Sequence, residues 1–459
     1  MASVLLEGGE QRLLLTKGSL EDVLSRCSWA EYRGQRYKIS FQEKNSVHAI
    51  VDELLEDGMK VLALAYKAHS ATTLQKSDER DLILLGYLAF FDAPKASAAA
   101  AIKKLKQLKV TIKVLTGDNA AVAQSIGTRV GLDSQQLLTG AQLAQLTDNE
   151  LPMKIENTTI FAELSPEQKQ QLVQLLQTNG HTVGFLGDGM NDLAAILKAD
   201  VGISVDTAVP AVKEIADVIL LKKDLLVLEE GILEGRRAFI NMSKYIKITA
   251  SSNLGNIIAI VIAGITLPFF PITSLQILLL NMLYDIICLI LPWDQVDGEL
   301  CDKPLEWSGR RLSRFMTFFG PLSSIFDVLT FIFLYSFLCP WLCGSSYHQL
   351  QGEAQKQFLA IFQTGWFLES MWSQVLILHL LRTPKLPFIE SRPSKPVLTV
   401  TLLGIVACTA LVMTPLGSSL GLTSLPPIYF VFLTLIVASY LCFVTIAKRL
   451  YVKYYQELI

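Results

Sequence analysis

Two long stretches of this sequence contain no charged side chain. One runs from Ile248 to Tyr284 and the other from Pro396 to Ala447. Each exceeds the roughly 20 apolar residues that an α-helix needs to cross the hydrocarbon core of a bilayer. Hydrophobic residues make up 51% of the chain and charged residues only 18%, so a purely soluble globular protein is excluded. We therefore predict that the C-terminal half is embedded in a membrane.

The second half contains six candidate membrane spans, which would form a helical bundle. Their approximate limits are 246–267, 273–292, 315–338, 358–381, 396–415 and 426–447. Lys and Arg gather before the first span, in alternate loops and after the last span, whereas the opposite loops contain only Lys356 of these two residue types. Because Lys and Arg remain on the cytoplasmic side, both termini and the soluble half are expected in the cytoplasm. The expected location is the plasma (inner) membrane.

Short β runs alternate with helical patterns in the first half of the chain. The β runs are Val110–Leu115, Val183–Leu186, Val201–Val205 and Val218–Leu221. Helical stretches such as Ala96–Leu108 and Pro166–Thr178 lie between them. This alternation is typical of an α/β fold with a doubly wound parallel sheet.

Residues 1–80 predict a separate α+β piece. It should contain a strand at Arg12–Thr16 and helices near Leu20–Cys27 and Ser46–Asp57. The expected domains are therefore 1–80, the α/β domain at 81–235, and a basic stalk with six spans at 236–459.

The charge balance argues against a nucleic-acid partner, and the cysteine pattern argues against a thiolate metal site. The chain has 40 Lys and Arg against 42 Asp and Glu, a net charge of −2, so no nucleic-acid partner is expected. Its seven cysteines form no CxxC pair, and we expect no thiolate metal site. Cys339 and Cys343 share one short loop and could form a disulfide.

The most informative string is Gly187-Asp188-Gly189-Met190-Asn191-Asp192, directly after an apolar strand. Ligands of an open α/β sheet collect at the carboxyl ends of its strands. Two carboxylates and an amide within one turn supply the hard oxygen ligands that Mg²⁺ prefers. The alternative is a turn that merely ends a strand.

A second polar string, Thr116-Gly117-Asp118, also follows a strand. A hydroxyl and exposed backbone amides suit a phosphoryl oxygen, because phosphoryl transfer depends mainly on positioning and charge neutralisation; a helix N-cap is the alternative. Lys169 could place an ammonium group against the same phosphate, or be a solvated lysine in the first turn of a helix. Lys17 and Gly18 could approach a nucleotide, or form a simple turn.

The membrane half contains a candidate cation site. Asp285 is the only charged residue between Ile248 and Trp293, and a carboxylate at mid-membrane costs on the order of 3 kcal/mol by insertion scales. Asn281 lies one helical turn earlier on the same face, and the preceding span offers Asn253 and Asn256. Together they could coordinate a hard cation, or form a structural hydrogen-bond cluster. Two further acids, Asp327 and Glu369, fit packing as well as transport.

The order of these motifs resembles that of P-type ATPases. The soluble strings are Lys17-Gly-Ser19, Asp92-Ala-Pro-Lys95, Thr116-Gly-Asp-Asn119, Ser165–Lys169 and Gly187–Asp192. Strings in the membrane half are similar to the magnesium-importing branch of that family. They are Ser251–Asn256, Asn281–Asp285, Phe318–Pro321, Ser324–Asp327 and Gln363–Phe367. The resemblance covers essentially all 459 residues.

The resemblance implies a haloacid-dehalogenase-like domain, a partial nucleotide-binding domain at the N-terminus, and the cofactors ATP and Mg²⁺. Asp188 would hold the catalytic Mg²⁺, with Asn191 and Asp192 ordering the site. Thr116, Gly117 and Asp118 would bind the phosphoryl group and Lys169 would neutralise it. Lys17 and Gly18 would contact ATP.

The sequence also departs from the family. Glu163 replaces the usual Arg before the Ser-Pro pair, Asp92–Lys95 is a variant of DPxK, and Leu193-Ala194 replaces the Ala-Pro pair after GDGxND. The DKTGT string that carries the phosphorylated Asp is absent, since the only Asp-Lys pair is Asp302-Lys303. The TGES loop and the first four spans are absent too. We therefore expect a C-terminal fragment, inactive alone, whose partner is an N-terminal half with the actuator domain.

The leading hypothesis is the C-terminal part of an ATP-driven pump that imports Mg²⁺ through an Asn281/Asp285 site. The alternatives are a pump for Ca²⁺ or Mn²⁺ and a non-catalytic truncated membrane remnant. A membrane-anchored phosphatase is disfavoured because such an enzyme also needs the absent nucleophile.

Overall fold

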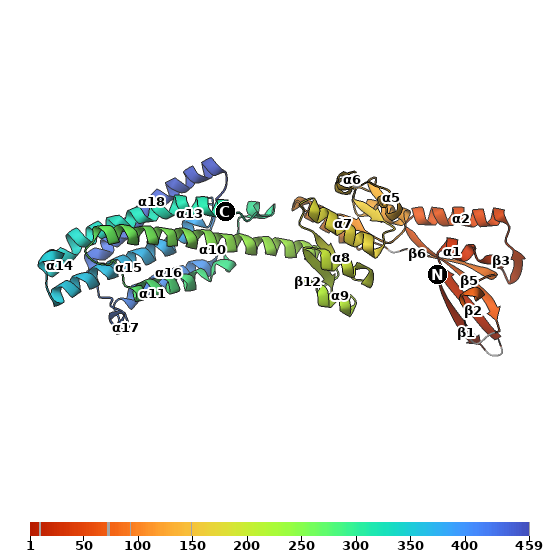
Figure 1. Ribbon diagram of the computed structural model, residues 1–459, viewed down its shortest axis with the longest axis horizontal. Coiled ribbons are helices and arrows are strands. Elements are labelled where there is room, and N and C mark those ends of the chain that lie inside the picture. The colour runs from red at the N-terminus through yellow and green to blue at the C-terminus, as the bar shows by residue number, and fades with distance from the viewer. Residues whose placement is uncertain (9–10, 71–73, 92, 148, 459) are drawn as a thin grey trace. The chain divides into compact units, whose positions relative to one another are not determined.

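The computed structural model describes residues 1–8, 11–70, 74–91, 93–147 and 149–458. Asp92 of the Asp92–Lys95 string lies outside these residues. The chain divides into two compact units, Met1–Gly231 and Ile232–Ile459, whose elements are labelled in Figure 1.

A six-stranded sheet opens the first unit, with the strand order β1-β2-β5-β6-β3-β4. The strands are β1 (Ala2–Gly8), β2 (Gln11–Gly18), β3 (Cys27–Tyr32), β4 (Gln35–Lys38), β5 (Met59–His69) and β6 (Leu82–Phe91). Helices α1 (Leu20–Leu24) and α2 (Phe41–Glu56) accompany it, and Leu14, Val23 and Ala63 form its fully buried core. β6 pairs with β5, so this sheet continues to Phe91, past the boundary at residue 80 expected from the sequence.

The rest of the first unit contains two three-stranded parallel sheets, where the sequence predicts one doubly wound sheet. One has the order β7-β9-β8 and the other β10-β11-β12. The strands are β7 (Val114–Leu115), β8 (Leu137–Thr139), β9 (Ile160–Ala162), β10 (Gly184–Leu186), β11 (Val201–Val205) and β12 (Val218–Leu220). The helices are α3 (Ala98–Gln107), α4 (Ala120–Arg129), α5 (Gly140–Leu143), α6 (Leu151–Asn157), α7 (Pro166–Thr178), α8 (Leu193–Lys198) and α9 (Pro210–Ile215).

The division of the sheet follows from strand pairing. Within the described chain, β7 pairs with β9 alone and β10 pairs with β11 alone. Only the last two residues of the predicted strand Val110–Leu115 form β7, because these two pair with β9. Strand residues without a neighbouring strand leave their backbone hydrogen-bonding groups unpaired. Leu115 and Val183 nevertheless contact the hydrophobic clusters of both sheets. The two sheets thus share one core although no described strand joins them.

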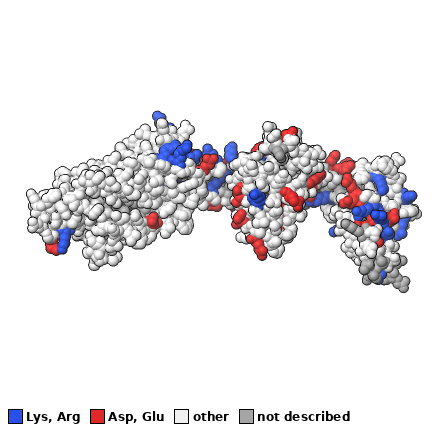
Figure 2. Space-filling model, in the orientation of Figure 1, with Lys and Arg blue, Asp and Glu red and all other residues white. Residues whose placement is uncertain are grey.

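The second unit is helical. It contains most of α10 (Leu225–Thr266), whose first residues belong to the first unit. Its other helices are α11 (Ser274–Cys288), α12 (Gly298–Cys301), α13 (Gly309–Phe333), α14 (Cys339–Cys343), α15 (Glu353–Leu381), α16 (Lys395–Leu411), α17 (Pro415–Ser419) and α18 (Pro427–Tyr455). On the face drawn in Figure 2, most of this unit is uncharged, and Lys and Arg gather at one of its ends. The disulfide considered for Cys339 and Cys343 is not formed, since both thiols are free.

Four helices, rather than the predicted six, are long and apolar enough to cross a membrane in the described chain. They are Leu225–Thr266, Ser274–Trp293, Gly309–Cys343 and Pro427–Tyr455. The predicted span 358–381 lies in α15, which buries polar side chains such as Glu369 and Gln374 inside the unit; a helix enclosed by protein needs no apolar surface. The predicted span 396–415 corresponds to α16, which has only 17 residues.

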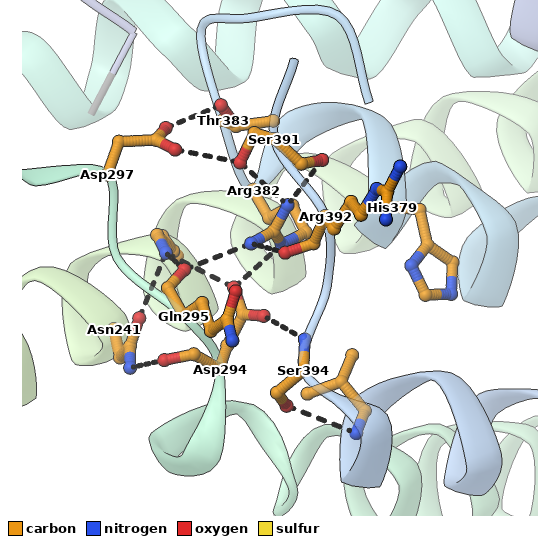
Figure 3. A network of polar contacts seen from close by, with 12 residues as sticks. Asn241, Asp294, Gln295, Asp297, His379, Arg382, Thr383, Ser391, Arg392 and Ser394 are labelled. Atoms are coloured by element: carbon orange, nitrogen blue, oxygen red, sulfur yellow. Dashed lines mark hydrogen bonds and ion pairs between the residues drawn. The ribbon is translucent and has the colours of Figure 1, made fainter. Parts of the chain in front are cut away.

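A buried polar network, which we call the Asp294 network, joins α10, the chain after α11 and the loop before α16 (Figure 3). Asp294 Oδ2 accepts from Arg382 Nε at 2.7 Å and from Lys244 Nζ at 3.2 Å, and all three side chains are at most 1% exposed. Arg382 also donates to the carbonyl oxygens of Gln295 and Arg392, at 2.9 and 3.2 Å. This network fixes one end of the helical unit because each of its charges has a partner.

Candidate functional site

The loop after β10 places Asp188 at the end of a parallel strand, as the sequence predicts. Its Oδ2 lies 2.6 Å from Lys223 Nζ, and its side chain is 49% exposed. The glycine before it is required by close packing, since a Cβ on Gly187 would lie 2.6 Å from Cβ of Asp192. Gly187 thus lets Asp192 fold back over the strand end, so that both carboxylates stay on one side of the loop.

A cavity of about 370 Å³ opens beside this loop. Its charged lining comes from Asp188, Asp192, Lys95, Lys223 and Asp224. The amide of Leu226 hydrogen-bonds to the Asp224 carboxylate at 2.9 Å and lowers its pKa, so this group is ionised at neutral pH. Three carboxylates and two ammonium groups therefore share one cavity, a combination suited to a magnesium–phosphate ligand.

Lys169 connects this cavity to the other parallel sheet. It lies in the first turn of α7, is 8% exposed, and its Nζ is 2.7 Å from Oδ1 of Asp192. The helix begins at a capping box in which Ser165 and Gln168 satisfy each other's backbone amides, and this fixes where Lys169 points. The structure thus brings Asp188, Asp192 and Lys169 together.

The Thr116 loop forms a compact structure of its own. Thr116 Oγ1 donates to Asp118 Oδ2 and accepts from the Asp118 amide, each at 3.1 Å. Asp118 Oδ1 also lies 3.0 Å from Lys60 Nζ. The described lining of the Asp188 cavity includes neither Thr116 nor Asp118, and their strands, β7 and β10, lie in different sheets. The structure therefore describes no direct contact between the Thr116 loop and the Asp188 loop.

Glu163 has a local role that the sequence did not reveal. Its backbone adopts a left-handed φ of 57°, and its Oε1 accepts from the amide of Ala120 at 3.1 Å. Ala120 begins α4, so the carboxylate binds the positive end of that helix. This hydrogen bond gives the acidic residue a stabilising partner at the position where Arg is usual in the family.

The remaining soluble candidates lie apart from this cavity. Lys17 and Gly18 end β2 in the six-stranded sheet, and Lys17 is exposed. Asn191 is exposed on a short 3₁₀ turn, Met190–Asp192. The described cavity lining includes none of the three.

The four membrane candidates are only partly gathered. Asp285 and Asn253 are exposed on α11 and α10, and Asn281 is half-buried. Asp285 accepts a long hydrogen bond of 3.4 Å from Tyr245. Asn256 instead accepts from Gln374 of α15 at 3.2 Å. Among the described residues there is no group of three or more His, Cys, Asp or Glu that could hold a metal, so the helical unit contains no closed cation site of that kind.

The sequence-based interpretation overlooked several residues of the Asp188 cavity. Lys223 and Asp224 follow the end of β12 by three and four residues, and the rule that polar groups collect at strand ends would have selected them. Lys95 belongs to the Asp92–Lys95 string, but the string does not indicate its role. In the structure Lys95 donates to the carbonyl oxygen of Lys223. Ser97 likewise donates to Asp224 at 3.0 Å. These contacts depend on tertiary structure, and the sequence pattern contains no signal for them.

Comparison with known proteins gives matches in both units. The family described as haloacid dehalogenase-like hydrolase matches residues 21–200, and the family described as cation transporting ATPase, C-terminus, matches residues 269–450. A haloacid-dehalogenase-like domain followed by this membrane region identifies the chain as a homologue of the P-type cation-transporting ATPases, which confirms the predicted resemblance.

Relatives named for magnesium transport match almost the whole chain. The "Magnesium-transporting ATPase, P-type 1" of Escherichia coli (strain K12) is 42% identical over 457 residues, covering 99% of this chain and 49% of the relative. The protein of that name from Salmonella typhimurium (strain LT2) gives the same values. The "Calcium-transporting ATPase" of Bacillus subtilis (strain 168) is 29% identical over 73% of this chain and 39% of the relative. The chain thus spans about half the length of the curated relatives it matches.

Proposed function

We propose that this chain is the C-terminal part of an ATP-driven P-type pump that imports Mg²⁺ across the plasma (inner) membrane. Its termini and soluble unit face the cytoplasm, and six helices, including α15 and α16, cross the bilayer. The observation that carries the proposal is the 42% identity over 99% of the chain to magnesium-transporting relatives. The assembled group of Asp188, Asp192 and Lys169 supports it.

Each candidate residue of the soluble unit has its own role in phosphoryl transfer. Asp188 and Asp192 would hold the catalytic Mg²⁺, which neutralises phosphate charge when bound. Lys169, paired with Asp192 at 2.7 Å, brings an ammonium group next to that carboxylate. The Thr116-Gly117-Asp118 loop offers a hydroxyl and backbone amides to the phosphoryl oxygens, and Asn191 orders the metal loop. Lys17 and Gly18 contact ATP.

The nucleophile would come from the N-terminal half of the pump. β7 and β10 each leave one edge open within the described chain, although their sheets share core residues such as Leu115 and Val183. One strand inserted between these edges would complete a single parallel sheet. An Asp at its carboxyl end would then lie between the Thr116 and Asp188 loops, because parallel strands place their ends at the same edge.

The membrane unit also requires further helices. Asp285 and Asn253 are exposed on α11 and α10, and an ionised carboxylate facing lipid costs on the order of 3 kcal/mol. The first four spans of the N-terminal half would cover this face. They would complete the Mg²⁺ site that Asn253, Asn256, Asn281 and Asp285 begin.

The test is complementation in bacteria that lack their own magnesium importers. The chain alone should not restore growth at low Mg²⁺, whereas co-expression with an N-terminal half that contains DKTGT should restore it. Asp188→Asn should abolish the rescue, and Asp206→Asn, in an exposed loop, is the matched control. Rescue by Asp188→Asn would contradict the assignment of the metal site. Failure of the wild-type pair, with both halves present in the membrane, would favour the truncated remnant.

Ion identity is tested on the complete pump. We expect Mg²⁺ to stimulate ATP hydrolysis in proportion to transport, and Asp285→Asn to lower its apparent affinity. If Ca²⁺ or Mn²⁺ stimulates ATP hydrolysis and additional Mg²⁺ does not, the chain belongs instead to a pump for Ca²⁺ or Mn²⁺.

A further inference from the structure

Two acidic side chains are buried inside the helical unit. Asp327 lies on α13 and is 4% exposed, and Glu369 lies on α15 and is 1% exposed. Trp366, which precedes Glu369 by almost one turn of α15, donates to Asp327, so Glu369 lies on the side of α15 that faces Asp327. Their residue types fit packing as well as transport, and the pump proposed above does not use them.

The two carboxyl groups have few donors. Trp366 Nε1 donates to Asp327 Oδ1 at 2.7 Å, while Oε2 of Glu369 is buried without a hydrogen-bond partner in the part of the chain that the structure describes. No described Lys, Arg or His forms an ion pair with either acid. Two adjacent ionised carboxylates would repel each other, and burial without a counter-charge makes this state costly.

The polar groups around the pair are hydroxyl groups, which supply no positive charge. Tyr440 of α18 lies close to both acids, and Tyr429 of the same helix lies close to Glu369. The Tyr429 hydroxyl donates to the carbonyl oxygen of Gly365, so its proton is already used. Ser373 faces Glu369, but its hydroxyl donates to the carbonyl of Ser370 at 3.1 Å.

A proton fits this site better than a metal. The described residues place only two acids here. A hard cation would need several further oxygens. A single proton on Glu369 supplies the missing hydrogen-bond donor, because the protonated Glu369 can donate to the Asp327 carboxylate. The other oxygen of Asp327 already accepts from Trp366.

We propose that Asp327 and Glu369 form a proton-binding site in the membrane unit, in which one proton is held on Glu369 and shared with Asp327. Neither acid is a member of the Asn253, Asn256, Asn281 and Asp285 group proposed above. It does not depend on the identity of the transported ion. One negative charge then remains on the pair, held by Trp366 and by the shared proton.

Infrared spectroscopy of the full chain in lipid nanodiscs tests this directly, because a protonated carboxylic acid has a C=O stretching band distinct from that of a carboxylate. At pH 7.5 we expect one buried protonated carboxyl group. Its band should shift on ¹³C-glutamate labelling, which requires no substitution and so avoids any effect on folding. Glu369→Gln should remove the band and Asp327→Asn should shift it, whereas Asp302→Asn, in a loop, should leave it unchanged.

Two results would overturn the proposal. One is a spectrum without a glutamate-derived protonated band at pH 7.5, which would mean that Glu369 is ionised. The other is disappearance of the band when MgCl₂ is added, which would mean that the pair binds the metal itself. Neither result bears on the complementation test of the pump, so the two proposals fail separately.

Discussion

Replacing Arg382 by Met should severely destabilise the helical unit. The side chain is 1% exposed and its guanidinium donates to Asp294 Oδ2 at 2.7 Å, as well as to oxygens of Gln295, Ser391 and Arg392. Met fills a similar volume but removes every one of these hydrogen bonds. Breaking a buried ion pair by removing one partner costs about 3–5 kcal/mol. Lys244, at 3.2 Å, still faces Asp294, so we expect the lower half of that range.

The assay is equilibrium unfolding of the detergent-solubilised chain with increasing SDS, followed by circular dichroism. Arg310→Met is the matched control, because Arg310 is an exposed arginine in the same unit, and surface substitutions usually change stability by less than about 0.5 kcal/mol. An Arg382→Met loss no greater than that of the control would refute the reasoning, since it would show that the Asp294 network contributes no net stability.

Three further predictions concern single residues. Lys169→Met should lower the free energy of unfolding by about 1–3 kcal/mol, because it leaves the half-buried Asp192 carboxylate unpaired; thermal unfolding of the full chain measures this, and an unchanged midpoint would contradict the pairing. Burial raises the pKa of the Cys27 thiol from 9.0 to about 11, so alkylation at pH 8 should be roughly 100-fold slower than in the denatured chain. The rate should rise with pH up to about 11; a plateau near pH 9 would disprove the shift. Asp285→Asn should weaken Mg²⁺-dependent ATP hydrolysis by the complete pump at least about tenfold, because a neutral amide replaces a charged ligand, and unchanged kinetics would remove Asp285 from the transport site.

Much of the soluble site could be predicted because its signals are local. Asp188 follows its strand by two residues, and the adjacent glycine permits the tight fold of the loop against Asp192. The cap at Ser165 likewise determines where α7 begins. Signals of this kind depend on backbone geometry within a few residues, so one sequence contains them in full.

Four of the six predicted spans are long and apolar enough to cross a membrane in the described chain. Hydropathy averages every side chain of a segment, and α15 buries the polar Glu369 and Gln374 among its neighbours, so its polarity does not follow the rule for lipid-exposed spans. The single parallel sheet was wrong for the described chain. β7 and β10 could belong to one sheet only if a further strand lay between them. No residue pattern within β7 or β10 indicates whether that strand is present.

The sequence by itself determined the type of chemistry: which loops carry oxygen ligands, which stretches avoid water, and which family the chain resembles. Those properties follow from residue type and short spacing. Only the tertiary structure decided which charges meet. Arg382 and Asp294 lie in separate polar loops of the sequence and appear solvated there, yet folding buries both and makes each the partner of the other. Glu163 likewise gains its partner, the amide of Ala120, only in the folded chain, and the packing of α15 against α13 places Trp366 and Glu369 beside Asp327.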